Sequence, residues 1–320
     1  MIHSLRVKVA GVSIVFRSDM EVDICHLRDL YRHHVIGGFT AGPEHEVRIE
    51  TVTKSVLPSD ARLVWSGYYH GVGCDGHFDN TVKKYVSADG KSEYFVTPSG
   101  ECLINDLTKP LTVCTLMSHR KMFAKGRVRS NVGTMVILLT HIVAARHCRY
   151  TLHASSVAWR ERAVVFVGRS GQGKSTLCLD LVARGAGFMG DDIVFAYHED
   201  GIVKIAPLLF DAKMFEPGKK EKTFIDVTSK YGSVDIDGLP LQAICEIEPT
   251  RKGESVVDVQ YDSDRLFDVF LQSANNLALQ YDNEDWLTLC ATVMSNYQLY
   301  KFYFGDRQQL SVDSLNALYE

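Results

Sequence analysis

The chain has 320 residues, which is enough for two domains and a sizeable core. Its 35 basic and 39 acidic residues give a formal net charge of −4, so no overall attraction to nucleic acid is expected. The eight cysteines include no C-x-x-C pair and no zinc-type cluster with histidine, a pattern typical of reduced thiols in a cytoplasmic protein.

The sequence predicts no membrane segment. The first residues alternate like a strand and lack the apolar core of a signal peptide. The most apolar helix, expected at about 132–145, is interrupted by Thr140 and His141 and is shorter than the roughly 20 residues that cross a bilayer. We therefore expect a cytoplasmic protein with neither nucleic acid nor a membrane as its partner.

The first third of the chain is rich in strand-like patterns. Alternating or β-rich runs occur at 5–16, 47–52, 62–69 and 91–96, separated by Gly, Pro, Asn and Asp. One helix is expected at 21–35, with three histidines nearby: His26, His33 and His34. These indicate a surface or packing feature, and the alternative of a metal site lacks the carboxylates or cysteines that would complete it. Residues 1–118 are predicted to form an α+β domain of mostly strands.

A basic segment follows at 120–129. It is broken by Gly126, and the next residue after it, Ser130, is a suitable N-cap for the apolar helix. We expect a linker at 119–130 between the first domain and a second one at 131–320. The segment could neutralise a phosphate or an acidic peptide near an active site, but an ordinary solvated linker has the same composition.

A phosphate-binding motif is the most informative feature of the chain. Residues 168–175, Gly-Arg-Ser-Gly-Gln-Gly-Lys-Ser, fit the pattern G-x-x-x-x-G-K-[ST]; a buried strand is expected before them at 163–167 and a helix after them, ending at Gly185. A chance match in a glycine-rich turn would not usually have this context. Lys174 is expected to contact the β- and γ-phosphates of ATP or GTP, and the Ser175 hydroxyl to bind Mg²⁺. The residues expected to surround the nucleotide are Gly168, Arg169, Ser170, Gly171, Gln172, Gly173, Lys174, Ser175 and Thr176.

An acidic pair, Asp191 and Asp192, begins seventeen positions after Lys174. This interval holds one helix and a short apolar stretch at 187–190. A right-handed crossover would make that stretch a strand parallel to 163–167, so both carboxylates would lie near the γ-phosphate. One carboxylate can then hold Mg²⁺ while the other accepts the proton of an attacking hydroxyl. The alternative is a solvated turn that caps the next element.

Three motifs together resemble the catalytic core of the HPr kinase/phosphorylase family. They are Leu-His-Ala-Ser at 152–155, the loop at 168–175, and Arg-Gly-x-Gly-x-x-x-Asp-Asp at 184–192. The resemblance is closer to the relatives that phosphorylate a serine of lasso-peptide precursors, because those share Leu-His-Ala-Ser and the Ser-Thr found here at 175–176, where the bacterial HPr enzymes have Leu-His-Gly and Ser-Glu. It implies an α/β fold of the HPr-kinase-like (PEP-carboxykinase-like) type, in which a curved sheet surrounds the loop helix.

The resemblance also implies a role for each matching residue. Lys174 binds the phosphates, Ser175 binds Mg²⁺, Asp191 deprotonates the acceptor hydroxyl, and Asp192 supports the metal. His153 matches the active-site histidine of the family, although a satisfied core histidine is the ordinary reading of a histidine in a strand.

The resemblance weakens after about residue 192. Glu216 lies where the family has a metal-binding glutamate, with a changed spacing to the next glycine, and residues 273–276 lack two arginines with which HPr enzymes contact phosphate. Those differences argue against phosphorylase activity and against HPr as substrate. Lys213, in a second basic group at 213–222, is a candidate for contacting the transferred phosphate. Family members are often oligomers, which implies a possible homo-oligomer here.

Three function classes follow. The first is a kinase that transfers the γ-phosphate of ATP to a serine-type hydroxyl of a peptide or protein, with the first domain recognising the acceptor. The second is a kinase for a small molecule such as free serine. The third is a nucleotide-dependent regulator without an acceptor, which needs a metal site but no base. The acidic pair favours a kinase, and the size of the first domain favours a peptide or protein acceptor.

Overall fold

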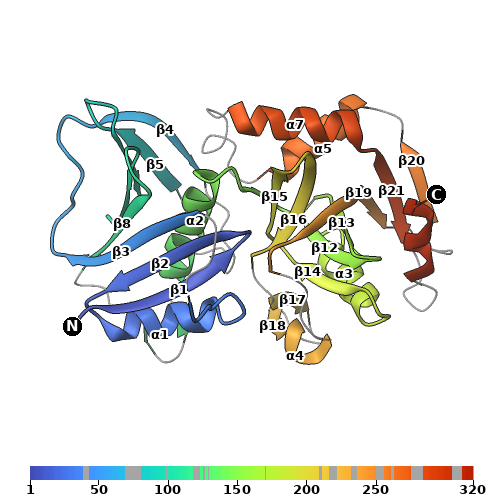
Figure 1. The fold of residues 1–320 in the computed structure, drawn as a ribbon, viewed down its shortest axis with the longest axis horizontal. Coiled ribbons are helices and arrows are strands. Elements are labelled where there is room, and N and C mark those ends of the chain that lie inside the picture. Colours follow the sequence, from blue (N-terminus) through green and yellow to red (C-terminus); the bar gives the residue numbers. More distant parts are fainter. Residues whose placement is uncertain are drawn as a thin grey trace. The chain divides into compact units, whose positions relative to one another are not determined.

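The computed structural model describes residues 1–38, 43–68, 81–98, 100–117, 123–124, 127–128, 130–169, 171–208, 211–215, 222–231, 236–249, 256–260, 263–274, 284–304 and 312–319. The chain divides into two compact units, Met1–His147 and Cys148–Glu320 (Figure 1). Both units contain a large β-sheet, so the protein is a mixed α/β protein. None of the helices in the described part of the chain combines the length and the apolar character needed to cross a bilayer.

The first unit is built on one sheet with the strand order β1-β2-β3-β8-β7-β6-β5-β4. Neighbouring strands are antiparallel except β2 with β3 and β3 with β8, which are parallel. The strands of this unit are β1 (His3–Val9), β2 (Val12–Ser18), β3 (Glu44–Val52), β4 (Arg62–Tyr68), β5 (Thr81–Val86), β6 (Ser92–Val96), β7 (Cys102–Asp106) and β8 (Leu111–Met117), followed by the short pair β9 (Phe123–Ala124) and β10 (Arg127–Val128).

The run at 5–16 is a hairpin of two strands, β1 and β2. The chain turns at Ala10 and Gly11, whose φ angles are 48° and 79°. Two consecutive residues with positive φ form the turn whose twist matches a two-residue hairpin. Alanine is an unusual residue at such a position, which is why the turn was not visible in the sequence.

Two helices belong to the first unit, α1 (Glu21–Leu30) and α2 (Ser130–Ala145). Helix α1 buries Ile24 and Leu27 and is shorter than expected, because the chain leaves the helix at Tyr31. The Tyr31 hydroxyl forms a hydrogen bond with the Thr140 hydroxyl of α2, whose second half is buried. Because α2 is tied to this unit, the compact units divide one helix later than the linker expected at 119–130.

The second unit contains a sheet with the strand order β11-β15-β16-β19-β13-β12-β14, extended by β21 and β20 beside β19. Strands β13, β19 and β21 are parallel to one another, and β12 is antiparallel to β13. The strands are β11 (Tyr150–Leu152), β12 (Ser155–Trp159), β13 (Arg162–Val167), β14 (Gly187–Gly190), β15 (Val194–Glu199), β16 (Ile202–Pro207), β19 (Leu239–Pro249), β20 (Val256–Gln260) and β21 (Leu299–Phe304), with β17 (Asp211–Phe215) and β18 (Lys222–Asp226) as a separate pair.

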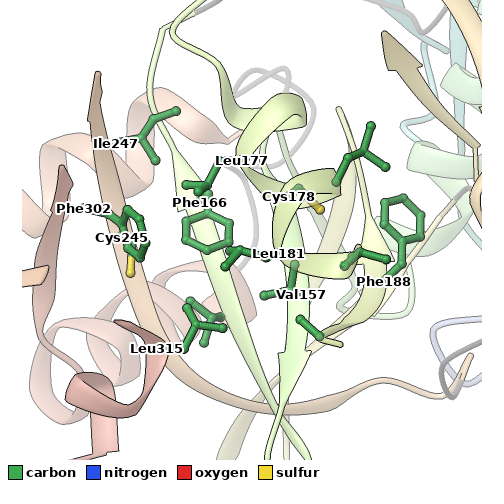
Figure 2. Packing of buried hydrophobic residues seen from close by; sticks show 14 of the residues in the cluster. Val157, Phe166, Leu177, Cys178, Leu181, Phe188, Cys245, Ile247, Phe302 and Leu315 are labelled. Carbon is green, nitrogen blue, oxygen red and sulfur yellow. The ribbon is translucent and has the colours of Figure 1, made fainter. Parts of the chain in front are cut away.

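The helices of the second unit are α3 (Lys174–Val182), α4 (Val227–Tyr231), α5 (Ser263–Ser273), α7 (Glu284–Asn296) and the 3₁₀ helix η1 (Val312–Tyr319). Helix α3 packs on the sheet through Leu177, Cys178 and Leu181, which meet side chains of β12, β13 and β14 (Figure 2). Phe166 of β13 also lies edge-to-face against Phe302 of β21, with ring centroids 5.6 Å apart. Helix α3, which follows the loop at 168–173, is thus held by a buried hydrophobic core.

Helix α3 ends in a glycine-dependent turn. The amide of Gly185 donates to the carbonyl of Val182, and the amide of Ala186 donates to the carbonyl of Leu181. This pair of bonds, with Gly185 at φ 109°, is a Schellman motif and satisfies two carbonyls at the end of the helix. The predicted stop at Gly185 is confirmed.

Candidate active site

The loop between β13 and α3 lies at the carboxyl end of a buried strand. Gly168, Gly171 and Gly173 all have positive φ, at 148°, 85° and 97°. A Cβ at Gly168 would come within 2.5 Å of the Gln172 amide oxygen, the end of a flexible side chain that can move away, and 3.1 Å of Ile247, so the positive φ is the main reason for glycine there. Helix α3 begins after Gly173 with no side-chain N-cap, which leaves the amides of its first turn for an anion.

Lys174 folds back over this loop. Its ammonium donates to the carbonyl of Gly168 at 2.8 Å and to that of Arg169 at 3.3 Å, and the residue is only 7% exposed. A positive charge is therefore held at the centre of the loop by the loop's own backbone. This is the position from which a lysine can contact the phosphates of a nucleotide.

The acidic pair follows β14, as the sequence predicted. Strand β12 is antiparallel to both β13 and β14, so β13 and β14 are parallel to each other with β12 between them. Ser156 of β12 is aligned with both Val165 and Gly190, which brings the ends of β13 and β14 to the same edge of the sheet. The predicted parallel crossover is confirmed, and Asp191 and Asp192 leave the sheet beside the phosphate loop.

The two aspartates have different surroundings. Asp191 is 4% exposed and accepts a hydrogen bond from the Ser155 hydroxyl at 2.6 Å. The side chain of Asp192 is 34% exposed, and its backbone has φ 71°, a left-handed conformation that is uncommon for a residue with a side chain. One carboxylate is thus fixed and buried, while its neighbour faces solvent.

His153 joins this group from the strand side. Its Nδ1 lies 3.3 Å from a carboxylate oxygen of Asp192, and its amide donates to the carbonyl of Ser273 at the end of α5. Burial and the positive charge of Lys174 hold the pKa of His153 below its usual value, although both aspartates act in the opposite direction. The imidazole is therefore neutral at pH 7, and its Nδ1 stays in polar contact with the Asp192 carboxylate.

Lys174, His153, Asp191 and Asp192 are therefore brought together at one edge of the sheet. His153 is not enclosed by apolar core but lies against a carboxylate, and the roles expected for these four residues stay predictions. Such a cluster of one cation, one neutral imidazole and two carboxylates beside an anion-binding loop suits phosphoryl transfer.

The sequence is similar to that of an HPr kinase/phosphorylase. The relative, from Lactobacillus johnsonii, is 25% identical over 184 residues, which cover 51% of this chain and 57% of the relative. The chain thus spans little more than half the length of that relative. A solved HPr(Ser) kinase/phosphatase from Coxiella burnetii shares 16% identity with this chain and gives a TM-score of 0.31, over 53% of this chain and 91% of that structure. No family model matches the chain.

Sequence reasoning gave no role to Ser155. It is fully buried in β12, and its hydroxyl orients the carboxylate of Asp191. No local pattern announced this contact, because His153 and Ala154 form a break between β11 and β12 and Ser155 lies 36 positions before Asp191. Ser273 was also missed as the backbone partner of His153, since no local pattern announces a contact across 120 positions of sequence.

The remaining predicted site residues lie in or near α3 and β17, or outside the described residues. Ser170 and Glu216 lie outside the described residues. Lys213 is the third residue of β17. Its neighbour in this strand, Ala212, is buried in the same core cluster as Leu177 of α3. Ser175 and Thr176 are partly exposed in the first turn of α3, next to Lys174. The described structure therefore locates the loop helix and the acidic pair and leaves the remaining site residues as predictions.

Proposed function

We propose that this protein is an ATP- and Mg²⁺-dependent kinase that transfers the γ-phosphate to a serine-type hydroxyl of a peptide or protein. The observation that carries the proposal is the convergence of Lys174, His153, Asp191 and Asp192 beside the phosphate loop. The sequence similarity to an HPr kinase/phosphorylase supports the reaction type. The motifs shared with lasso-peptide kinases support a ribosomally made precursor peptide as the acceptor.

The loop would hold the donor. Its glycine-lined backbone and the amides at the start of α3 would bind the β- and γ-phosphates, and the Lys174 ammonium would exchange its bonds with the loop carbonyls for bonds with phosphate oxygens. The backbone contacts fix the position of the phosphates, and the lysine charge offsets the negative charge that develops on the transferred group.

Mg²⁺ is commonly bound through one or two carboxylates together with the phosphates of the nucleotide. The exposed carboxylate of Asp192 and the hydroxyl of Ser175 are oxygen ligands of the kind it prefers, and Glu216 is proposed as a further ligand. When bound, the ion would neutralise charge on the β- and γ-oxygens. The contact between Nδ1 of His153 and the Asp192 carboxylate, at 3.3 Å, would orient Asp192 toward that position.

Asp191 is proposed as the general base. The acceptor hydroxyl gives its proton to this carboxylate while its oxygen forms a bond to the γ-phosphorus, and the bond from the γ-phosphorus to the β-bridging oxygen breaks to release ADP. The Ser155 hydroxyl holds one oxygen of Asp191 and so orients the carboxylate. Lys213 is proposed to contact the transferred phosphate, and residues 1–118 to recognise the acceptor.

The direct test is incubation of the protein with γ-labelled ATP, Mg²⁺ and candidate precursor peptides, read by mass spectrometry for a gain of one phosphate. Lys174→Ala is expected to abolish transfer while the thermal unfolding midpoint stays close to that of the wild type, because the lysine acts on the transferred phosphate. Lys91→Ala, at an exposed lysine of the first unit, is the matched control and should transfer normally. Wild-type transfer by Lys174→Ala would remove the phosphate-loop assignment.

A further inference from the structure

A second polar site lies in the first unit, away from the phosphate loop in the sequence. It is a cavity of about 260 Å³ lined by the turn at 107–110 between β7 and β8, by His45 of β3, and by Arg146 and His147 just after α2. Three separate parts of the unit thus contribute to one cavity, and three of its side chains are basic or imidazole groups besides the fully buried His45.

A chain of hydrogen bonds supports these groups from behind. The Arg146 guanidinium donates to the Asn105 side-chain oxygen at 2.9 Å, and the same oxygen accepts from the Thr112 hydroxyl at 3.2 Å. Thr112 also lies 3.0 Å from Nε2 of His45, whose Nδ1 lies 3.3 Å from Nε2 of His147. Asn105 and Thr112 are buried, so the network is part of the core and not a surface arrangement.

The hydrogen bonds also determine which ring nitrogens of His45 and His147 carry a proton. Because the Thr112 hydroxyl donates to Asn105, it must accept from His45, whose proton is then on Nε2. The other ring nitrogen of His45 is left as an acceptor for the Nε2–H of His147. Arg146 and His147 are therefore held in place by buried partners that carry no charge.

The charges around the cavity do not cancel. Lys109 pairs with Asp106 at 3.2 Å, and Glu93, which accepts from Asn105, pairs with Lys84 at 2.8 Å. Among the residues that the structure describes, Arg146 forms no ion pair; its side-chain bond goes to a neutral amide, and the charges of Asp106 and Glu93 act on it without an ion-pair contact. Burial and then the charges of Arg146 and His147 lower the pKa of His45 to about 3, so His45 is neutral in this network.

We propose that this cavity is a binding site for a phosphate group. The Arg146 guanidinium, the Lys109 ammonium and the His147 ring line the cavity from different elements, and a tetrahedral oxyanion offers an oxygen to each of them; protonated His147 donates to it from Nδ1 while its Nε2–H stays with His45. A planar carboxylate would satisfy the guanidinium and leave the other donors unused. The phosphate belongs either to a free small anion or to a phosphorylated side chain of a peptide, and the site is independent of the proposed transfer reaction.

The test follows the histidine ring nitrogens of the full chain by long-range ¹H–¹⁵N correlation spectra while inorganic phosphate is added at constant ionic strength and pH 7. Phosphate is taken to about 20 mM, which covers the millimolar affinities expected for a single small anion. We expect the His45 and His147 resonances to shift saturably. In Arg146→Gln, which keeps amide donors toward Asn105, the apparent affinity should fall by about tenfold or more, and Arg146→Lys should restore part of it.

Three further arms make the result decisive. Arg28→Gln, at an exposed arginine of the same unit, should bind phosphate like the wild type. Lys174→Ala should keep the His45 and His147 shifts, since binding at the loop would move His153 instead. A phosphoserine peptide is compared with its unphosphorylated form: a response to the peptide at lower concentration than to phosphate identifies a protein ligand, and an equal or weaker response identifies a free anion. The proposal is overturned if neither probe shifts the two histidines, or if Arg146→Gln responds as strongly as the wild type.

Discussion

At the scale of single residues, the candidate site depends on two neighbouring carboxylates with unequal surroundings. Asp191 is buried and receives a hydrogen bond from Ser155, whereas Asp192 is partly exposed and lies 3.3 Å from Nδ1 of His153. A fixed carboxylate keeps one orientation toward an acceptor, and an exposed one can approach a hydrated metal ion. The structure therefore gives a physical basis for assigning them different roles.

Asp191→Asn keeps the size of the side chain but removes the proton acceptor. We expect Mg²⁺-ATP binding to survive in calorimetric titration while the transfer rate falls by roughly 10²–10⁴-fold, the usual loss for a general base. Asp192→Asn should instead weaken both the dependence on Mg²⁺ and the rate, because it removes charge from the metal shell. Rates across a Mg²⁺ series separate the two effects.

The control for both variants is Asp200→Asn, in the exposed turn between β15 and β16, which should leave binding and rate unchanged. If Asp191→Asn lost metal-nucleotide binding and Asp192→Asn lost only the chemical step, the two roles would be exchanged. If neither variant slowed transfer, the pair would be a structural turn, the alternative that the sequence left open.

At the scale of elements, the sequence predicted the strand, loop and helix at 163–185 and the returning strand, because each carries a local signal. The apolar run, the glycines and the stop at Gly185 act within a few residues. The insertion of β12 between β13 and β14 was not predictable in this way, since strand order depends on pairing across the sheet. For the same reason the sequence did not reveal that Ser155 contacts Asp191.

Two glycines, Gly185 after α3 and Gly190 at the end of β14, allow a matched comparison. Gly185→Ala places a side chain at φ 109° in open space, so the cost is backbone strain of about 1 kcal/mol in unfolding free energy, with activity retained. Gly190→Ala, at φ 143°, also puts its Cβ 2.9 Å from a methyl group of Val194 and must shift the chain just before Asp191. We expect it to lose transfer activity as well as stability.

Urea unfolding curves and transfer rates measured on both glycine variants test this comparison. Equal activity in the two variants would show that the end of β14 tolerates movement and that the position of Asp191 is less critical than the structure indicates.

At the scale of the whole molecule, the candidate site residues and helix α2 lie in different compact units. The phosphate loop and the acidic pair lie in Cys148–Glu320, while α2, expected from the sequence to belong with them, lies in Met1–His147. Its apolar composition could not reveal which unit covers it, because that depends on distant partners such as Tyr31. The sequence thus supplied the existence of α2 but not its place.

A fragment that begins at Cys148 should therefore aggregate less than one that begins near 120, because the longer fragment would expose the buried residues of α2. We expect the shorter fragment to bind Mg²⁺-ATP and to lose affinity for the acceptor peptide, since acceptor recognition is proposed for the first domain. Calorimetry and peptide phosphorylation measure the two properties. Equal acceptor turnover by the fragment and the full chain would refute this division.

The first unit should also be sensitive to acid. Burial lowers the pKa of His141 to about 3 and that of His45 to the same value, below the usual value of 6.5. A depressed pKa means that the unfolded chain takes up the proton first, so stability is complete above pH 6.5 and falls as the pH decreases toward 3. Each histidine then costs about 1.4 kcal/mol of unfolding free energy per pH unit in that window.

His141→Leu removes one of these protonation sites while keeping an apolar volume in α2. Between pH 7 and pH 5 the unfolding free energy of the variant should decrease by about 2 kcal/mol less than that of the wild type. Hydrogen exchange of amides in the first unit measures this difference. His198→Gln, at an exposed histidine of β15, should lose as much as the wild type. An unchanged pH dependence in His141→Leu would place the acid sensitivity elsewhere.

The position of β13 in its sheet has a consequence for synthesis on the ribosome. Its partner on one side, β12, precedes it directly, and helix α3 and β14 follow within a short stretch, so the phosphate loop and the acidic pair can assemble from local contacts. Its partner on the other side, β19, begins at Leu239 and is therefore synthesised only after roughly 70 further residues. Until β19 emerges, the nascent chain presents the unpaired edge of a strand made of Ala, Val and Phe, which is the kind of edge that chaperones must shield from other chains.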